Sequence, residues 1–156
     1  MNTPLYPMFR KRIDDAIEQL IKKQVTSWCF LNSGRPFRVT AFDGRQIAYE
    51  GILFDGTPQS VFWSRYIEPF LEDLAISEIA AAVAMAQERR VDAKLLLPEV
   101  NELLNTGIKK VFSKMADVDR RLRGKGYPEK VQLRPTDNEL RNMTEFVEVR
   151  IRSELA

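Results

Sequence analysis

The chain has 156 residues, of which 44% are hydrophobic and 29% charged, with a formal net charge of +2, one cysteine and no histidine. This composition is that of an ordinary globular protein, and the length predicts a single domain over residues 1–156. The absence of histidine excludes Ser-His-Asp and Cys-His nucleophile pairs and histidine-ligated metals within this chain, and one cysteine excludes an internal disulfide and a thiolate zinc or iron–sulfur site within a monomer.

The first predicted element is an amphipathic helix within residues 1–25. Pro7 suits a first helical turn, and apolar side chains then recur at spacings of three and four residues up to Ile21. Acidic and basic residues are mixed on the opposite face, which a helix lying on a membrane surface would avoid. We therefore expect this helix to pack on a protein core.

Residues 26–63 are predicted to form an antiparallel meander of three or four strands. Phe37, Val39 and Ala41 alternate with polar residues, and Ile47 and Tyr49 do so after Asp43-Gly44. A three-residue turn over 42–44 would pair Val39 with Ile47 and Phe37 with Tyr49, which places the apolar side chains on one face. Closure of the meander into a barrel stays open.

The region 64–123 is predicted to be helical, with one helix beginning near Pro69 and another near Pro98. The second helix has a long apolar stripe and ends near Arg123, before a linker over 124–135 that contains Gly124 and Gly126. The stripe consists of Val100, Leu103, Leu104, Ile108, Val111, Phe112, Met115, Val118 and Leu122.

The last predicted element is a helix over 136–156. Thr136 with Glu139 three residues on is a capping-box pattern, and apolar residues follow at helical spacing. Residues 146–152 also alternate as a strand would, so a strand remains the alternative there. Together these elements predict an α+β fold, in which a small meander is flanked by an N-terminal helix and two to three C-terminal amphipathic helices.

No sequence pattern indicates a catalytic, cofactor-binding or metal-binding residue. Neither phosphate-binding glycine motif occurs, and Cys29, between Trp28 and Phe30, is expected to be buried and inert. The longest apolar run, 79–86, is far shorter than the roughly twenty residues that span a bilayer, so we expect a cytoplasmic protein with no membrane partner. An enzyme using histidine-free carboxylate chemistry is the third functional hypothesis.

The segment Lys109–Arg134 carries nine basic residues and three acidic ones. This asymmetry makes nucleic-acid binding the second hypothesis, because cations beside an aromatic residue can contact phosphates and stack on a base. Cations at a helix C-terminus also complement the helix dipole, which is the competing explanation. The candidate nucleic-acid-binding residues are Arg120, Arg121, Arg123, Lys125 and Tyr127.

The leading hypothesis is a non-catalytic binding or adaptor protein that acts through helical surfaces. Several apolar helical stripes and alanine-rich helix surfaces in a chain of this length favour a protein partner, first of all a second copy in a homodimer. The residues selected as a candidate interface are Val111, Met115, Val118 and Leu122, for which an ordinary core position is the alternative.

Overall fold

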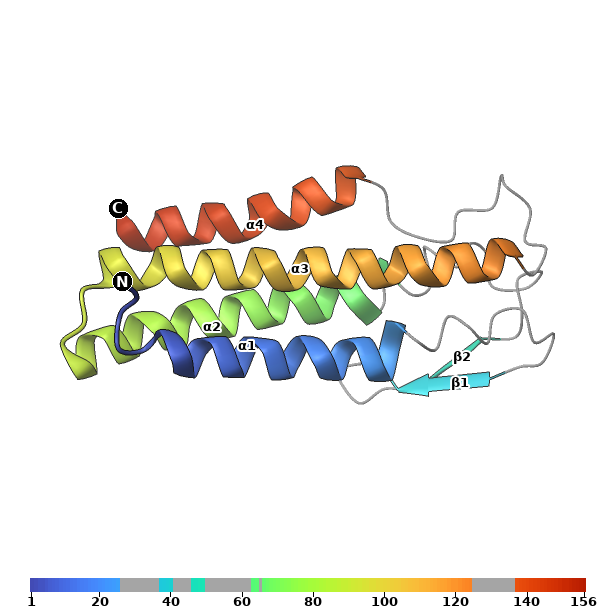
Figure 1. Ribbon diagram of the computed structural model, residues 1–156, viewed down its shortest axis with the longest axis horizontal. Coiled ribbons are helices and arrows are strands. Elements are labelled where there is room, and N and C mark those ends of the chain that lie inside the picture. The colour runs from blue at the N-terminus through green and yellow to red at the C-terminus, as the bar shows by residue number, and fades with distance from the viewer. Residues whose placement is uncertain (26–36, 41–45, 50–62, 65, 125–136) are drawn as a thin grey trace.

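The computed structural model describes residues 1–25, 37–40, 46–49, 63–64, 66–124 and 137–156. Four long helices lie along a common axis: α1 (Tyr6–Leu20), α2 (Glu68–Arg89), α3 (Ala93–Gly124) and α4 (Asp137–Leu155). Helices α1 and α3 run in one direction, and α2 and α4 run in the other (Figure 1). Helix α3 contacts each of the other three, and α2 also contacts α1 and α4, so α2 and α3 form the centre of the bundle.

The predicted α+β class is wrong, because the described part of the chain is built as a bundle of four helices. Of the expected meander, the structure describes one hairpin of two four-residue strands, β1 (Phe37–Thr40) and β2 (Gln46–Tyr49). Its antiparallel pairing joins Phe37 to Tyr49 and Val39 to Ile47, as the sequence predicts. The predicted turn over 42–44 and the rest of the meander lie outside the described residues. The core, as far as the structure describes it, comes from the helices and the residues next to them, and the described part of the alternating segment is this hairpin.

Helix α1 continues into η1 (Ile21–Val25), a turn of π-helix. The core face of α1 consists of Phe9, Ile13, Ile17 and Leu20, all buried. An α-helical continuation would rotate Val25 well away from that face, whereas the wider winding of a π turn brings it back. Val25 and Gln24 are accordingly both buried. The helical residues thus run from Tyr6 to Val25, within the segment 1–25 where the sequence predicts a helix, and the last turn is wound differently.

A tight connection joins α2 to α3. Arg90 ends α2 in the left-handed region, at φ 57°, and the amide of Val91 donates to the carbonyl of Ala86 at 2.9 Å. Asp92 then caps the start of α3, because its Oδ1 accepts from the amide of Lys94 at 2.9 Å. Helix α3 therefore begins at Ala93 and not near Pro98, which lies inside the helix. Asp92 was the sequence signal for the start of α3, and the sequence prediction did not use it.

Helix α4 settles the alternatives for residues 146–152, which are helical throughout. Val147 and Ile151 are buried one turn apart, whereas Val149 points outward and is 61% exposed. A strand would have placed all three side chains on the same face. The capping signal at the start of this helix therefore predicted its type correctly, against the β-branched composition.

All four helices contribute to one hydrophobic core. Helices α1 and α3 meet closely at Gly107 of α3, where an added Cβ would lie 2.8 Å from Cγ1 of Ile17 on α1. Glycine here lets the two helices approach closely.

At the N-terminus, the carboxylate of Glu99 accepts from both the amide and the hydroxyl of Thr3, at 2.6 and 2.7 Å. Among the described helices, none is both long and apolar enough to cross a membrane.

Candidate functional site

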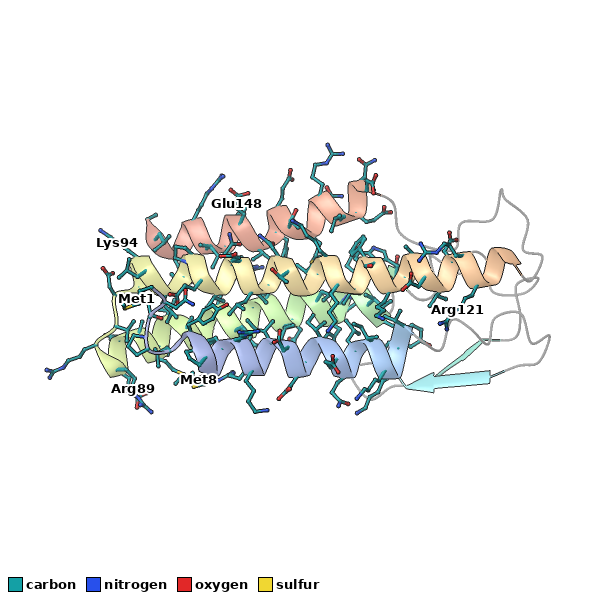
Figure 2. The ribbon with its side chains drawn as sticks, in the orientation of Figure 1. Met1, Met8, Arg89, Lys94, Arg121 and Glu148 are labelled. Carbon is teal, nitrogen blue, oxygen red and sulfur yellow. The ribbon has the colours of Figure 1, made fainter. Side chains whose placement is uncertain are left out.

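The predicted nucleic-acid-binding residues lie at the C-terminal end of α3, as far as the structure describes them. Arg120 and Arg121 are exposed, and Arg120 forms an ion pair with Asp117 on its own helix. Arg121 extends from the end of the bundle opposite to Lys94 and Arg89 (Figure 2). The side chain of Arg123 and residues Lys125 and Tyr127 lie outside the described residues, so the predicted combination of cations and aromatic ring stays a prediction.

The residues selected as a candidate interface lie on the inward side of α3. Val111 and Met115 are 0% exposed and Val118 is 5% exposed, and all three belong to the core of their own chain. The side chain of Leu122 is outside the described residues. Val111, Met115 and Val118 therefore occupy ordinary core positions, which was the alternative explanation for them. An interaction surface has to be sought on residues that face outward.

One described depression and the described acidic groups bear on the enzyme hypothesis. A shallow depression of about 340 Å³ lies over α1, and its charged groups already pair along the helix, with Lys11 Nζ 2.8 Å from Asp15 Oδ2. The hydrogen bond and charge of Asp15 raise the pKa of Lys11. Within the described ranges, no group of three or more cysteine, aspartate or glutamate side chains is arranged to hold a metal ion.

Glu68, in the first turn of α2, is the described carboxyl group with a raised pKa. Burial is the main cause, the charges of Glu72 and Glu139 add to it, and the nearby indole N–H of Trp63 opposes it. Glu68 does not line the depression over α1. Glu68 is therefore a carboxyl group whose surroundings favour its protonated form more than those of an ordinary glutamate do.

The outward side of α2 is the most unusual described surface. Six exposed positions fall within about 100° of the helix circumference, at 100° per residue, and we call them the α2 face. Between its two ends the face carries no charge over roughly 21 Å of helix. The α2 face consists of Asp73, Ile76, Ser77, Ala80, Ala84 and Gln87.

The other helices differ clearly from α2 on their outward sides. The exposed positions of α1 include Arg10, Lys11, Asp14 and Asp15, and those of α4 include Arg141, Glu145, Glu148 and Arg152. Exposed helix surfaces normally carry such mixed charge. On α2, small and apolar residues occupy the equivalent positions, and Ile76 is 43% exposed. The α2 face is therefore suited to contact with another protein surface.

The charged residue in the middle of α2 points away from the α2 face. Glu78 is 6% exposed, and its Oε1 lies 3.0 Å from the guanidinium of Arg12 on α1. Its other oxygen, Oε2, is buried without a hydrogen bond to any described residue. The run 74–87 thus keeps its one charge inside the bundle, which leaves the outward side neutral.

Sequence reasoning noticed the alanine-rich character of this helix but did not identify its outward side. The available signal was the run 74–87, in which Glu78 is the single charged residue of fourteen, although 29% of the whole chain is charged. Comparison with known proteins adds nothing to this geometry: no family model matches the chain, and no curated protein or solved structure is significantly similar to it.

Proposed function

We propose that this chain is a binding protein of adaptor type, whose contact surface is the α2 face and whose first partner is a second copy of itself. The observation that supports this proposal is the exposed, uncharged stretch between Asp73 and Gln87. Apolar exposed surface with charge only at its rim is typical of protein interfaces. A second copy is favoured because, when the α2 helices of two copies pair antiparallel, the acidic end of each helix lies beside the basic end of the other.

The complementarity follows from residue spacing along α2. An antiparallel pair centred between Ala80 and Ala84 places Ala80 of one copy opposite Ala84 of the second, and Ser77 opposite Gln87. The same register brings Asp73 beside Arg90, which is exposed at the C-terminal end of α2. A twofold axis repeats each of these contacts. The pair would thus combine a central apolar contact with an ion pair at each end.

Side-chain size supports the same register. Ala80 and Ala84 have no bulk beyond Cβ, so the two helix axes can approach closely at the crossing point. Ile76 flanks this point and would lose its exposed area to the second copy, at about 25 cal/mol for each Å² removed from water. The ion pairs at the rim would set orientation and register more than affinity.

The first experiment measures the mass of the protein by sedimentation equilibrium across the micromolar range. We expect the wild type to dimerise and the double variant Ala80→Glu/Ala84→Glu to stay monomeric, because it buries four like charges at the crossing point of the pair. Thr106→Glu, on an exposed position of α3, is the matched control and should dimerise normally. A wild type that remains monomeric at every concentration would contradict the proposal.

A charge exchange tests the register itself. Asp73→Arg alone and Arg90→Asp alone should each weaken the dimer, because each places like charges together at both ends of the pair. The double variant Asp73→Arg/Arg90→Asp should recover it, since the opposite charges again meet. Aspartate tolerates the left-handed conformation of position 90. If the double variant is weaker than both single ones, the antiparallel register is wrong.

We further propose that the protein works in the cytoplasm. The support for this is its cysteine content: Cys29 has no second cysteine in the chain with which to form a disulfide. An adaptor of this kind would present the outward sides of α1, α3 and α4 to other partners, while α2 holds the two copies together.

A further inference from the structure

Ile76 and Glu78 point to nearly opposite sides of α2, and each side chain has the surroundings that suit the other. Successive residues of a helix are rotated by about 100°, so two positions apart differ by about 200°. Ile76 is 43% exposed, whereas Glu78 is 6% exposed. An amphipathic helix ordinarily turns apolar side chains to the core and charged side chains to water. At these two positions α2 has the reverse of that arrangement.

The inward position of Glu78 costs free energy. Its Oε1 accepts from the guanidinium of Arg12, but its Oε2 is buried without a hydrogen bond to any described residue. A carboxylate removed from water with an incomplete set of partners is destabilising. Exposure of the Ile76 side chain has a cost as well, because apolar surface is left in water. Both side chains would therefore gain if α2 turned about its own axis.

The middle of α2 is able to pack in more than one rotational setting. Residues 79–86 are all apolar, so no polar residue marks an outward side over roughly two turns of the helix. Five of these eight residues are alanine. A turn would therefore exchange side chains of similar size against the neighbouring helices, and exchanges that conserve volume cost little. The apolar pattern of this stretch does not select the observed setting.

The polar ends of the α2 face permit a partial turn. Asp73 and Gln87 are exposed at the two ends of that face. A turn of about 60° is enough to carry Ile76 inward and Glu78 to the edge of the bundle. It would leave Asp73 and Gln87 at the edge as well, where their polar groups still reach water. The turned setting therefore requires no burial of a further charge at these positions.

Arg12 stabilises the observed setting against the turned one. Its Nη2 lies 3.0 Å from Oε1 of Glu78, and its side chain is 43% exposed. The guanidinium also lies over the ring of Phe9, which is 0% exposed and holds it beside α2. A turn of α2 would break this ion pair. The role that is best attested for a buried ion pair is to select one arrangement over another, and the pair contributes little net stability.

We propose that α2 has two rotational settings and that the ion pair of Arg12 with Glu78 selects the one in which the α2 face is exposed. In the second setting Ile76 packs inside the bundle and Glu78 lies at its edge. Packed helices switch between discrete arrangements of this kind. The surface that α2 offers to a partner would thus change without unfolding of the helix. The setting is a property of one chain, so it does not depend on whether two copies pair.

The test is methyl NMR of Arg12→Met, with nuclear Overhauser contacts from the δ1 methyl group of Ile76 as the readout. We expect Arg12→Met to gain contacts between Ile76 and core methyl groups of α3 and α4 that the wild type lacks. Without its cation, Glu78 moves toward water and Ile76 turns inward. Pairing of two copies would give Ile76 contacts with the second α2 helix instead, so the two effects are distinguishable. An Arg12→Met variant with the wild-type contacts would overturn the proposal.

Arg12→Met/Glu78→Leu separates the turn from a general loosening of the bundle. Leucine at position 78 has no charge to bring to water, so the double variant should return to the wild-type contacts of Ile76. If the double variant keeps the contacts of Arg12→Met, the charge of Glu78 does not drive the turn and the proposal fails. Circular dichroism should show unchanged helix content in both variants. If Arg12→Met does not fold, Arg12→Gln replaces it, because glutamine also removes the ion pair.

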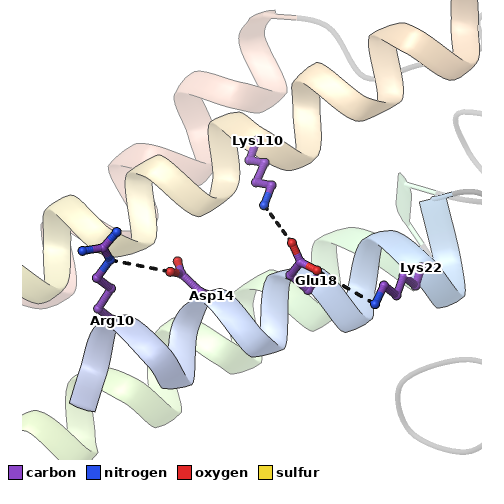
Figure 3. A network of polar contacts seen from close by, with 5 residues as sticks. All are labelled: Arg10, Asp14, Glu18, Lys22 and Lys110. Atoms are coloured by element: carbon purple, nitrogen blue, oxygen red, sulfur yellow. Dashed lines mark hydrogen bonds and ion pairs between the residues drawn. The ribbon is translucent and has the colours of Figure 1, made fainter. Parts of the chain in front are cut away.

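Lys110→Met is the control, because it removes the cation of another ion pair between helices. Lys110 Nζ of α3 lies 3.1 Å from Oε1 of Glu18 on α1, and Lys22 Nζ lies 4.0 Å from the other oxygen (Figure 3). The side chains of Lys110 and Glu18 are 48% and 49% exposed, so no buried charge results. The contacts of Ile76 should stay as in the wild type. New contacts equal to those of Arg12→Met would overturn the specific role of Arg12.

Discussion

Arg12 on α1 and Glu78 on α2 form an ion pair in which the two partners differ greatly in exposure. The guanidinium lies 3.0 Å from Oε1 of Glu78, and the side chains are 43% and 8% exposed respectively. Arg12 also lies over the ring of Phe9, 5.5 Å from its centroid. The carboxylate thus depends on a cation that reaches in from the surface, and α1 is joined to α2 through this contact.

Removing the cation should cost more than removing the acid. We expect Arg12→Met to lower the free energy of unfolding by about 2 kcal/mol, less than for a fully buried pair because Arg12 is partly solvated. Glu78→Leu should cost less, and Arg12→Met/Glu78→Leu less than Arg12→Met alone, because no buried charge then remains. Urea unfolding at neutral pH measures all three, and an Arg12→Met variant as stable as the wild type would contradict the pairing.

Gly107→Ala should destabilise the protein in spite of the better helix propensity of alanine. Propensity would gain up to about 1 kcal/mol, but the new Cβ would lie 2.8 Å from Cγ1 of Ile17, which is 2% exposed and has little room to move. Overpacking of this kind costs about 1–3 kcal/mol, so we expect a net loss of about 1 kcal/mol in thermal or urea unfolding.

Two further variants separate packing from propensity at this position. Thr106→Ala, on the neighbouring exposed position, should be neutral or stabilising, because it improves propensity without a new contact. Ile17→Ala should cost less in the Gly107→Ala background than in the wild type, since it removes Cγ1, the atom that the new Cβ would meet. Equal costs in both backgrounds would show that α1 and α3 do not press together at Gly107.

The titration of Glu18 should report the approach of α1 to α3. Its pKa is lowered from the ordinary 4.5 first by the hydrogen bond from Lys110, then by the charges of Lys110 and Lys22. A lowered pKa means that the native state binds this proton less readily, so the stabilisation is present above pH 4.5 and is lost as pH falls through the lowered value.

Lys110→Met should therefore raise the pKa of Glu18 toward 4.5, and Lys22→Met should raise it less. Carboxyl carbon shifts measured by NMR across the acid range give both values. Lys109→Met, one residue away and exposed, serves as the control and should leave the titration unchanged. A Glu18 titration that is identical in the wild type and Lys110→Met would place the two helices too far apart for this contact.

Local patterns predicted those features that depend on neighbours in the sequence. The register of Phe37 with Tyr49, the helix that starts at Asp137 and the long helix that ends at Gly124 all follow from alternation, capping or helical spacing. The class of the fold did not follow, because a hairpin pattern gives no measure of how large a share of the core it supplies. The regular alternation within one segment was interpreted as evidence for the fold class of the whole chain.

The α2 face and the contact between α1 and α3 depend on information that a local pattern does not contain. Alanine is compatible with both buried and exposed positions, so the outward side of α2 could not be separated from its inward side by periodicity. Lys22 and Lys110 are 88 positions apart, and their meeting on Glu18 requires α1 and α3 to be parallel neighbours. That neighbourhood is set by tertiary packing and not by either segment alone.

The tight connection between α2 and α3 also has a consequence for the order of folding. Arg90, Val91 and Asp92 are all that separates the two helices, so their contact closes a very short loop at little entropic cost, whereas α1 must find α3 across the whole intervening segment. We expect the α2–α3 pair to form first. Substitutions in the connection between these two helices, such as Asp92→Ala, should then slow folding, whereas Ile13→Ala on α1 should chiefly speed unfolding.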